Sequence, residues 1–203
     1  AFRFYDVDNA TAVTTTGQTV IKSTADMANI KYNKELGNPD LDSNIYIDTD
    51  SVFFSAVPLM DKRIPNWKEQ DQDTIAGYVN DIAEEMQDYL NDFYDILSKK
   101  IFNVDVDKHR LEIKKEYVAK AGLWVAKKRY AQWIINNNGV GCDELEVKGL
   151  DVVRSSFPTR FRAFMTEILK DILKDTPKQE IDDKIVALKR PVKNESVDDI
   201  AKT

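Results

Sequence analysis

The fold of this chain is organised around one short stretch, Asn44-Ile45-Tyr46-Ile47-Asp48-Thr49-Asp50-Ser51-Val52-Phe53-Phe54. The β-branched and aromatic residues on either side of its centre predict two strands, at residues 45–47 and 52–54. The four residues between these strands are typical of a tight turn, because Asp and Ser bond readily to nearby backbone. We therefore expect a β-hairpin that carries Asp48 and Asp50 at its tip.

Two carboxylates on a rigid hairpin hold negative charge in a fixed position. Such hard oxygen ligands are what divalent metal ions require. Asp and Thr are also common in ordinary surface turns, and the tetrapeptide alone favours that simpler interpretation. Other parts of the chain are needed to decide between a metal site and an ordinary surface turn.

The composition is that of a globular protein with one or two domains. The chain has 203 residues, of which 42% are hydrophobic and 32% charged, enough to form a core. The single cysteine, Cys142, excludes an internal disulfide and fits a reducing cytosol. No apolar run is long enough to span a bilayer and no signal-peptide pattern is present, so we expect no membrane partner. The single histidine, His109, excludes triads and zinc sites built on histidine.

Charge is distributed very unevenly along the chain. The net charge of -6 argues by itself against a nucleic-acid binder, which needs clustered Lys and Arg. Residues 69–95, however, contain only acidic charges, whereas residues 108–129 contain basic charges and only two acids, Glu112 and Glu116. We expect one acidic helix with a solvated face and one basic ribbon that could follow a phosphate backbone.

The hydrophobic patterning predicts both helices and strands. A helix capped by Asp8 or Asn9 is expected to run to about residue 33, and the clearest helix spans residues 74–99 with one apolar stripe. Residues 58–68 are expected to be irregular. Strands are predicted at 101–106, 111–117, 123–135 and 145–147, with turns at 120–122 and at 136–139. Pro158 and Pro177 are each placed to begin a further helix.

Residues 46–51, Tyr-Ile-Asp-Thr-Asp-Ser, resemble the Tyr-Gly-Asp-Thr-Asp-Ser palm motif of family B DNA polymerases. Ile47 departs from the Gly usual in the family. Further blocks resemble the polymerases of T4-like bacteriophages and occur in the family's order: Arg3-Phe4-Tyr5-Asp6 with Asn9-Ala10-Thr11-Ala12-Val13-Thr14 and Gly17-Gln18, Ala126-Lys127-Lys128-Arg129-Tyr130-Ala131, and Val147-Lys148-Gly149-Leu150 with Arg154-Ser155-Ser156-Phe157-Pro158.

The resemblance implies an α+β fold. We expect an antiparallel palm sheet packed by helices on one face, with the other face toward DNA, and a small C-terminal helical thumb portion. Residues 1–138 would be the C-terminal part of the palm, including the Asp-Thr-Asp hairpin. Residues 139–203 would be the palm-to-thumb connection and a partial helical thumb.

The resemblance also implies template-directed nucleotidyl transfer assisted by two Mg²⁺ ions, for which Mn²⁺ is a substitute. In that family the second aspartate of the pair is the main metal ligand, so Asp50 would be the principal catalytic residue and Asp48 the lesser one. Glu116 would be a further acid near the metals, although a salt-bridged surface Glu is an equal alternative. Thr49 would contact the nucleotide.

The family's Lys-Lys-Arg-Tyr signature is credited with holding primer DNA. We expect Lys127, Lys128, Arg129 and Tyr130 to alternate along one strand, so that Lys128 and Tyr130 share a face and contact phosphates. The alternative is a charged edge strand that deters aggregation.

The family's upstream palm aspartate and its fingers precede the motifs found in this chain. The chain alone is therefore expected to be inactive. Its expected partners are primer-template DNA, dNTPs, an N-terminal polymerase half (in the same chain or as a split subunit) and a sliding clamp, in the cytoplasm of an infected bacterial host cell. The alternatives are a non-catalytic nucleic-acid-binding module and the C-terminal subunit of a split polymerase.

Overall fold

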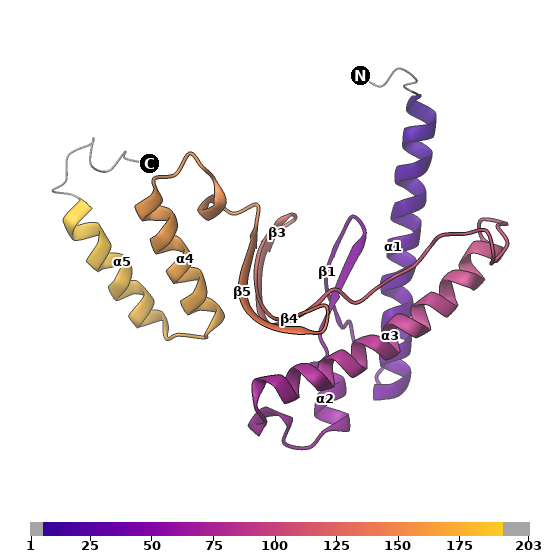
Figure 1. The fold of residues 1–203 in the computed structure, drawn as a ribbon, viewed down its shortest axis with the longest axis horizontal. Coiled ribbons are helices and arrows are strands. Elements are labelled where there is room, and N and C mark those ends of the chain that lie inside the picture. The colour runs from indigo at the N-terminus through magenta and orange to yellow at the C-terminus, as the bar shows by residue number, and fades with distance from the viewer. Residues whose placement is uncertain (1–5, 193–203) are drawn as a thin grey trace. The chain divides into compact units, whose positions relative to one another are not determined.

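A computed structural model describes residues 6–192 of the protein. The chain divides into two compact units, Ala1–Glu116 (unit 1) and Tyr117–Thr203 (unit 2). The described residues combine α-helices with two antiparallel sheets, which confirms the predicted α+β class (Figure 1). The assignment of residues 1–138 to a palm and 139–203 to a partial thumb stays a prediction. Residues Arg3 to Tyr5, which carry part of the resemblance, lie outside the described range.

The described residues of unit 1 form a helical assembly with one β-hairpin. Its elements are, in chain order, α1 (Val7–Leu36), β1 (Asn44–Asp48), β2 (Ser51–Phe54), α2 (Val57–Arg63), the 3-10 turn η1 (Trp67–Glu69) and α3 (Gln72–Lys100). The helix α2 and the turn η1 occupy much of the stretch from 58 to 68, so the prediction of an irregular segment there was wrong. Pro58 falls in the first turn of α2, where its missing N–H costs nothing.

The first helix begins earlier than predicted. Asp6 is its N-cap, and the Asp6 carboxylate accepts hydrogen bonds from the backbone N–H groups of Asp8 and Asn9. At the other end Gly37 has a φ of 71°, the left-handed conformation that closes a helix, and donates to the carbonyl of Asn33. The predicted helix is therefore confirmed, with ends that lie a few residues beyond both expected ones.

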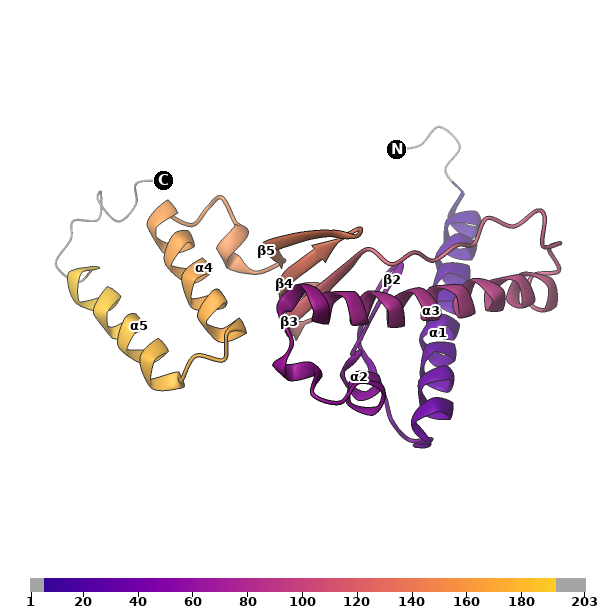
Figure 2. The same ribbon diagram turned by 60° about the horizontal axis from the view of Figure 1, so that its bottom comes forward.

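The apolar stripe of α3 forms the core of unit 1, as the periodicity predicted. Helix α3 crosses α1 (Figures 1 and 2) and packs against both α1 and α2. The residues in the buried cluster are contributed by these three helices and the segment before α2: Ala28, Tyr32, Ala56, Leu59, Met60, Ile82, Met86 and Leu90. One polar contact is buried with them, between the Thr24 and Tyr94 hydroxyls, whose oxygens are 2.8 Å apart.

The predicted strands at 101–106 and 111–117 were wrong, because no strand occurs between α3 and residue 117. The segment 111–115 is nevertheless extended. Its backbone is bonded by side chains of α3: Asn91 both accepts from the N–H of Ile113 and donates to its carbonyl, and Gln87 accepts from the N–H of Lys115. Residues 112, 114 and 116 are exposed, and those between them are half-buried. The alternation that predicted a strand is real, but its partner is a helix.

Up to residue 192, unit 2 contains a three-stranded antiparallel sheet and two α-helices. The elements are β3 (Tyr117–Ala126), β4 (Arg129–Asn137), β5 (Val140–Lys148), the 3-10 turn η2 (Asp151–Val153), α4 (Thr159–Leu173) and α5 (Lys178–Val192). The strand order is β3-β4-β5. The predicted turn around Asn138 and Gly139 is confirmed, and so are the helices that follow Pro158 and Pro177.

The predicted turn at residues 120–122 was wrong, because β3 continues through it. Gly122 has another role there. A Cβ atom at Gly122 would lie 2.3 Å from the ring of Trp124, so the missing side chain makes room for the indole. The first β-turn of the sheet falls instead at Lys127 and Lys128.

The aromatic side chain of Trp133 connects the sheet to α4. Its indole N–H donates to Asp143 of β5, and the Lys120 and Lys174 ammonium groups lie 3.9 Å and 5.2 Å from its ring centroid. Lys174 is the C-cap of α4. Two cations on one indole stabilise this packing by cation–π attraction.

We predict that Tyr94→Phe lowers the free energy of unfolding by about 1 kcal/mol, because the buried Thr24 hydroxyl loses its partner on α3. Thr24 already donates to the Val20 carbonyl, which leaves the Tyr94 hydroxyl as the donor of the shared bond. Urea denaturation of unit 1 measures the change, and half-buried Tyr78→Phe is the matched control. An equal loss in both variants would contradict the prediction.

Candidate active site

The hairpin that carries the two aspartates is present as predicted. Strands β1 and β2 pair antiparallel, with Ile47 opposite Val52 and Asp48 opposite Ser51. Thr49 and Asp50 are thus the two residues of the loop. The sequence therefore placed both carboxylates correctly, at the tip of a β-hairpin.

The tip is closed by an unusually tight turn. The backbone N–H of Asp50 donates to the carbonyl of Asp48 at 2.6 Å, and Thr49 between them has a φ of 52°. This is a γ-turn with a left-handed central residue, a strained conformation that a β-branched side chain rarely adopts. The Ser51 hydroxyl also donates to the carbonyl of Asp48, at 3.1 Å. The turn brings the Cα atoms of the two aspartates close together.

The two carboxylates differ in their surroundings. Asp48 is half-buried, and its Oδ1 accepts a hydrogen bond of 3.1 Å from the hydroxyl of Thr49. Asp50 is exposed. An exposed carboxylate on a fixed turn is accessible to an incoming ion, whereas Asp48 is oriented by its neighbour.

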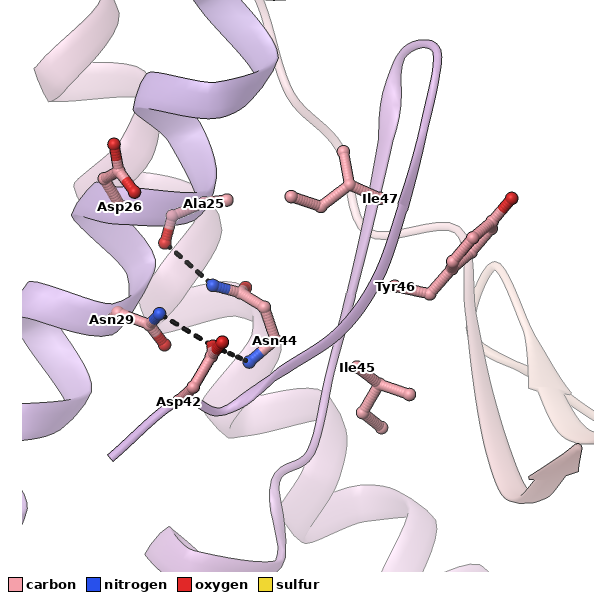
Figure 3. Close-up of a pocket in the computed structure, with 8 residues that line it drawn as sticks. All are labelled: Ala25, Asp26, Asn29, Asp42, Asn44, Ile45, Tyr46 and Ile47. Carbon is pink, nitrogen blue, oxygen red and sulfur yellow. Dashed lines mark hydrogen bonds between the residues drawn. The ribbon is translucent and has the colours of Figure 1, made fainter. Parts of the chain in front are cut away.

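Ile47, which replaces the usual Gly of the motif, lies toward α1. Figure 3 shows its side chain directed at the helix, whereas Tyr46 points to the opposite side of the strand. An open pocket of about 380 Å³ lies between α1 and β1 and is lined by Ala25, Asp26, Asn29, Asp42, Asn44, Ile45, Tyr46 and Ile47. The added bulk of Ile47 is therefore accommodated on the helix side of the hairpin.

Polar side chains fix the base of the hairpin on α1. The Asn44 amide donates to the Ala25 carbonyl at 3.0 Å, and Asn29 accepts from the N–H of Ser43 and donates to Asp42 (Figure 3). Asp42 also accepts from the N–H of Asn44, and these hydrogen bonds, that of Asn29 first, lower the pKa of its carboxyl. The sequence alone does not mark these residues as part of a site. Their only signal is an Asp-Ser-Asn run before a strand, which is typical of many turns.

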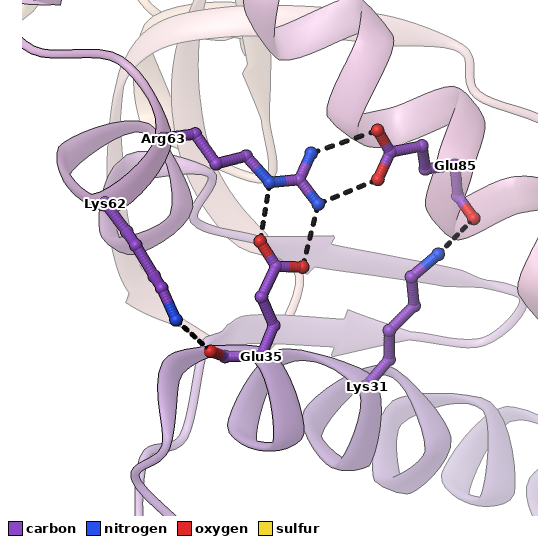
Figure 4. A network of polar contacts seen from close by, with 5 residues as sticks. All are labelled: Lys31, Glu35, Lys62, Arg63 and Glu85. Atoms are coloured by element: carbon purple, nitrogen blue, oxygen red, sulfur yellow. Dashed lines mark hydrogen bonds and ion pairs between the residues drawn. The ribbon is translucent and has the colours of Figure 1, made fainter.

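The helix that supports the hairpin is itself tied to α2 and α3. Arg63 of α2 donates two hydrogen bonds to Glu35 of α1 and two to Glu85 of α3 (Figure 4). Lys62 donates to the backbone carbonyl of Glu35, and Lys31 to that of Glu85. The Arg63 guanidinium lowers the pKa of Glu35. Paired forks of this kind fix the relative positions of three helices.

Glu116 is the last residue of unit 1 and directly precedes β3. It is exposed, and the extended segment before it is bonded to α3 through Gln87 and Asn91. Among residues 6–192 no group of three or more His, Cys, Asp or Glu side chains could hold a metal ion. The role of Glu116 as a further acid stays a prediction.

The expected arrangement of the basic signature was wrong. Lys127 and Lys128 do not alternate along a strand with Arg129 and Tyr130 but form the turn between β3 and β4, and Lys128 has a φ of 60°. Both lysines and Arg129 are exposed. The Arg129 guanidinium lies 3.8 Å from the Asp151 carboxylate, measured from Nη2 to Oδ2. Tyr130 is only 3% exposed. The two lysines therefore project from a β-turn, and Arg129 from the first position of β4, rather than all from one flat strand face.

Two of the motifs that are separate in sequence meet at this turn. Tyr130 of β4 is paired with Lys148 of β5. The pKa of Lys148 is raised mainly by its interaction with Glu146, and in addition by its interaction with the Tyr130 phenol. Gly149 has a φ of 65°, and a Cβ atom there would lie 2.0 Å from the Lys128 carbonyl oxygen. The Lys-Lys-Arg-Tyr turn thus requires the glycine of Val147-Lys148-Gly149-Leu150.

Comparison with known proteins identifies the family of the chain. The model of DNA polymerase family B matches residues 71–202. The chain is 26% identical over 185 residues to the DNA-directed DNA polymerase of Escherichia phage RB69 and 27% identical over 190 residues to that of Enterobacteria phage T4. Each comparison covers 86% of this chain and 20% of the relative.

The chain belongs to DNA polymerase family B. The resemblance drawn from its motifs is thereby confirmed, and both relatives are phage polymerases. The chain spans about a fifth of the length of the curated relatives it matches. No helix within residues 6–192 has the length and apolar character to cross a membrane.

We predict that the hydrogen bonds of Asp42 at the base of the hairpin are lost in acid. The folded pKa of Asp42 is below its unfolded value of about 3.9, so its contribution to stability is present above about pH 4 and is lost as the pH falls through the folded pKa. Protection factors of the Ser43 and Asn44 amides, corrected for intrinsic exchange rates, should drop below pH 4. Asp42→Asn, which does not titrate, should abolish this dependence; the same drop in that variant would contradict the assignment.

We predict that Thr49→Gly raises the free energy of unfolding by up to about 1 kcal/mol, because glycine adopts the left-handed conformation without a Cβ penalty. The gain is partly offset by the greater freedom of glycine in the unfolded chain. Chemical denaturation measures it, with Thr49→Ser as a control that keeps the hydroxyl donating to Asp48. A clear loss of stability in Thr49→Gly would show that the turn is not strained.

Proposed function

We propose that this chain is a fragment of a DNA-directed DNA polymerase that supplies part of the site for template-directed nucleotidyl transfer. Membership of DNA polymerase family B supports this proposal. The observation that carries it is the hairpin tip, where Asp48 and Asp50 flank one strained residue. Because the chain spans a fifth of its relatives, the activity belongs to the complete enzyme.

The donor set at the tip fits Mg²⁺ in kind. This ion is usually held by one or two carboxylates together with waters and substrate phosphates, and two carboxylates are available here. We assign Asp50 as the main ligand, since it is exposed, and Asp48 as the second, oriented by Thr49. Glu116 is the proposed further acid, and Thr49 at the apex the proposed nucleotide contact.

When bound, two Mg²⁺ ions would stabilise the attacking and leaving oxygens of the transferred α-phosphoryl group, and Mn²⁺ could replace them. The contribution of this chain is to hold the two carboxylates in place. The γ-turn and the Thr49 hydroxyl limit their freedom, and the contacts of Asn44 and Asn29 with α1 fix the strand that carries them. Preorganisation of this kind avoids reorganisation during the reaction.

We propose that the β3–β4 turn contacts the phosphates of primer-template DNA. Lys127, Lys128 and Arg129 are consecutive and exposed. Contacts of their charges with phosphates would not depend on the base sequence. Tyr130 is buried and interacts with Lys148. We therefore propose that Tyr130 supports this turn and contributes little direct contact with DNA.

We further propose that the chain does not polymerise alone. The resemblance implies that a further metal-binding aspartate and the fingers belong to an upstream part of the polymerase, outside the fifth of its relatives that this chain spans. The proposed partners are primer-template DNA, dNTPs, the remainder of the polymerase (in the same chain or as a split subunit) and a sliding clamp. The proposed location is the cytoplasm of an infected bacterial cell.

A non-catalytic nucleic-acid-binding module is the second candidate. It is favoured by the exposed basic turn, which could bind a duplex without any metal. In that case DNA affinity would be unaffected by Mg²⁺ and by Asp50→Ala, and no added polypeptide would produce extension.

Primer extension tests the proposal. The isolated chain should not extend a primer, and adding the preceding part of a family B polymerase should restore extension. Asp50→Ala should then lower the rate by about 10³-fold, since a lost metal ligand removes several kcal/mol of transition-state stabilisation. Exposed Asp40→Ala is the matched control and should have little effect. Robust extension by the isolated chain, or restored extension that does not depend on Asp50, would overturn the assignment.

A further inference from the structure

The extended segment 111–115 is bonded along one of its two edges. Asn91 of α3 accepts from the N–H of Ile113 at 2.9 Å and donates to its carbonyl at 3.1 Å. Gln87 accepts from the N–H of Lys115 at 2.9 Å. The Ile113 side chain packs against the buried cluster of unit 1. Helix α3 thus supplies through side chains the bonds that a neighbouring strand would supply through its backbone.

The opposite edge of this segment is open. Backbone groups of successive residues in an extended chain point to opposite edges, so those of Glu112 and Lys114 are directed away from α3. Within residues 6–192 the backbone N–H and C=O groups of Glu112 and Lys114 have no hydrogen-bond partner, and both residues are exposed. An unpaired strand edge of this kind is a template for pairing with another strand.

The side chains along the open edge alternate in the sign of their charge. The exposed residues are, in order, Arg110, Glu112, Lys114 and Glu116. Glu112 and Lys114 lie on one face of the segment, with Oε1 and Nζ 3.2 Å apart. Like charges directly opposite each other oppose strand pairing, whereas opposite charges favour it. An alternating pattern therefore allows pairing only in a register that brings opposite signs together.

This pattern is complementary to itself in one antiparallel register. When two copies pair around Ile113, Glu112 lies opposite Lys114 of the second copy, and Arg110 lies opposite Glu116 of the second copy. The two-fold axis repeats both pairs. Because the open backbone groups of Glu112 and Lys114 then face each other, each such pair exchanges two hydrogen bonds. The Arg110 guanidinium also donates to the His109 carbonyl at 2.7 Å, so the central pairs contribute more than the outer ones.

Other registers are unfavourable. A shift of two residues in either direction places Glu112 opposite Glu112 or Lys114 opposite Lys114, and parallel pairing in register opposes every charge to its own kind. A shift of one residue pairs an open residue with one whose backbone is already bonded to α3.

We propose that residues 110–116 form a two-fold antiparallel strand pair with a second copy of this chain. The contact is short, and stable interfaces usually bury at least about 1,200 Å² in total, so the dimer is weak and forms at high protein concentration. Because exposed charges select its register, salt weakens it. The pairing is independent of the proposed function, since neither metal nor DNA takes part in it.

Sedimentation of the full chain over a concentration series tests this pairing. Glu112→Lys and Lys114→Glu each place like charges opposite each other at both central pairs, so each should weaken dimerisation roughly tenfold. An equimolar mixture of the two variants should associate as well as the original chain, because the two substitutions together restore opposite charges. The control is Lys170→Glu, at an exposed residue of α4, which changes the net charge equally and should leave dimerisation unchanged.

Hydrogen exchange shows whether the edge itself pairs. The N–H groups of Glu112 and Lys114 should exchange more slowly as the protein concentration rises, whereas those of Ile113 and Lys115 are already bonded to α3 and should not change. A chain that stays monomeric, a dimer indifferent to both variants, or a mixture that does not associate overturns the inference. So does slower exchange at Glu112 and Lys114 only on addition of the preceding part of a family B polymerase, because the occupant would then be a strand of that polypeptide.

Discussion

The attachment of the hairpin to α1 is the constraint on which the candidate site depends. Asn44 reaches a main-chain carbonyl inside the helix, that of Ala25, and so uses an oxygen that already accepts an intrahelical bond. On the apolar side Phe54 packs edge-on against Tyr32, with ring centroids 5.7 Å apart. Polar and aromatic contacts therefore hold the base of a two-stranded ribbon that would be marginally stable by itself. The positions of Asp48 and Asp50 follow from that base.

The helix under the hairpin is held in turn by charge. Arg63 is about one-quarter exposed at its side chain and forms forks with carboxylates from two other helices. Single exposed ion pairs contribute little to stability, but a guanidinium shared between two carboxylates also restricts geometry. Its place at the end of α2 matters more than its energy, because it ties α1 to α3 beside the apolar cluster.

Much of this architecture could be predicted from periodicity and turn chemistry. The hairpin and α3 have strong local signals, and the structure confirms both. The extended segment before Glu116 could not be predicted correctly, because its backbone is bonded to the side chains of Gln87 and Asn91. No residue pattern distinguishes an extended segment bonded to a helix from a strand bonded within a sheet. Glycine was equally misleading at Gly122, where it accommodates the Trp124 ring instead of forming a turn.

The candidate site shows the same division. Residue types and local spacing were enough to place Asp48 and Asp50 at a hairpin tip, since both depend on a few neighbouring residues. The supporting contacts of Asn29, Asp42 and Asn44 join segments well separated in sequence, and only the folded chain reveals them.

The conformation of the basic turn depends on a residue outside its own motif. Two lysines in a turn are a weak signal, and one of them adopts a left-handed conformation that lysine seldom favours. The conformation becomes intelligible with its neighbour, because the carbonyl of Lys128 approaches Gly149 so closely that any side chain there would collide with it. The turn and the glycine are therefore one structural feature that the chain divides into two motifs. A resemblance that contains both blocks in the right order accordingly indicates a shared local fold more strongly than either block could alone.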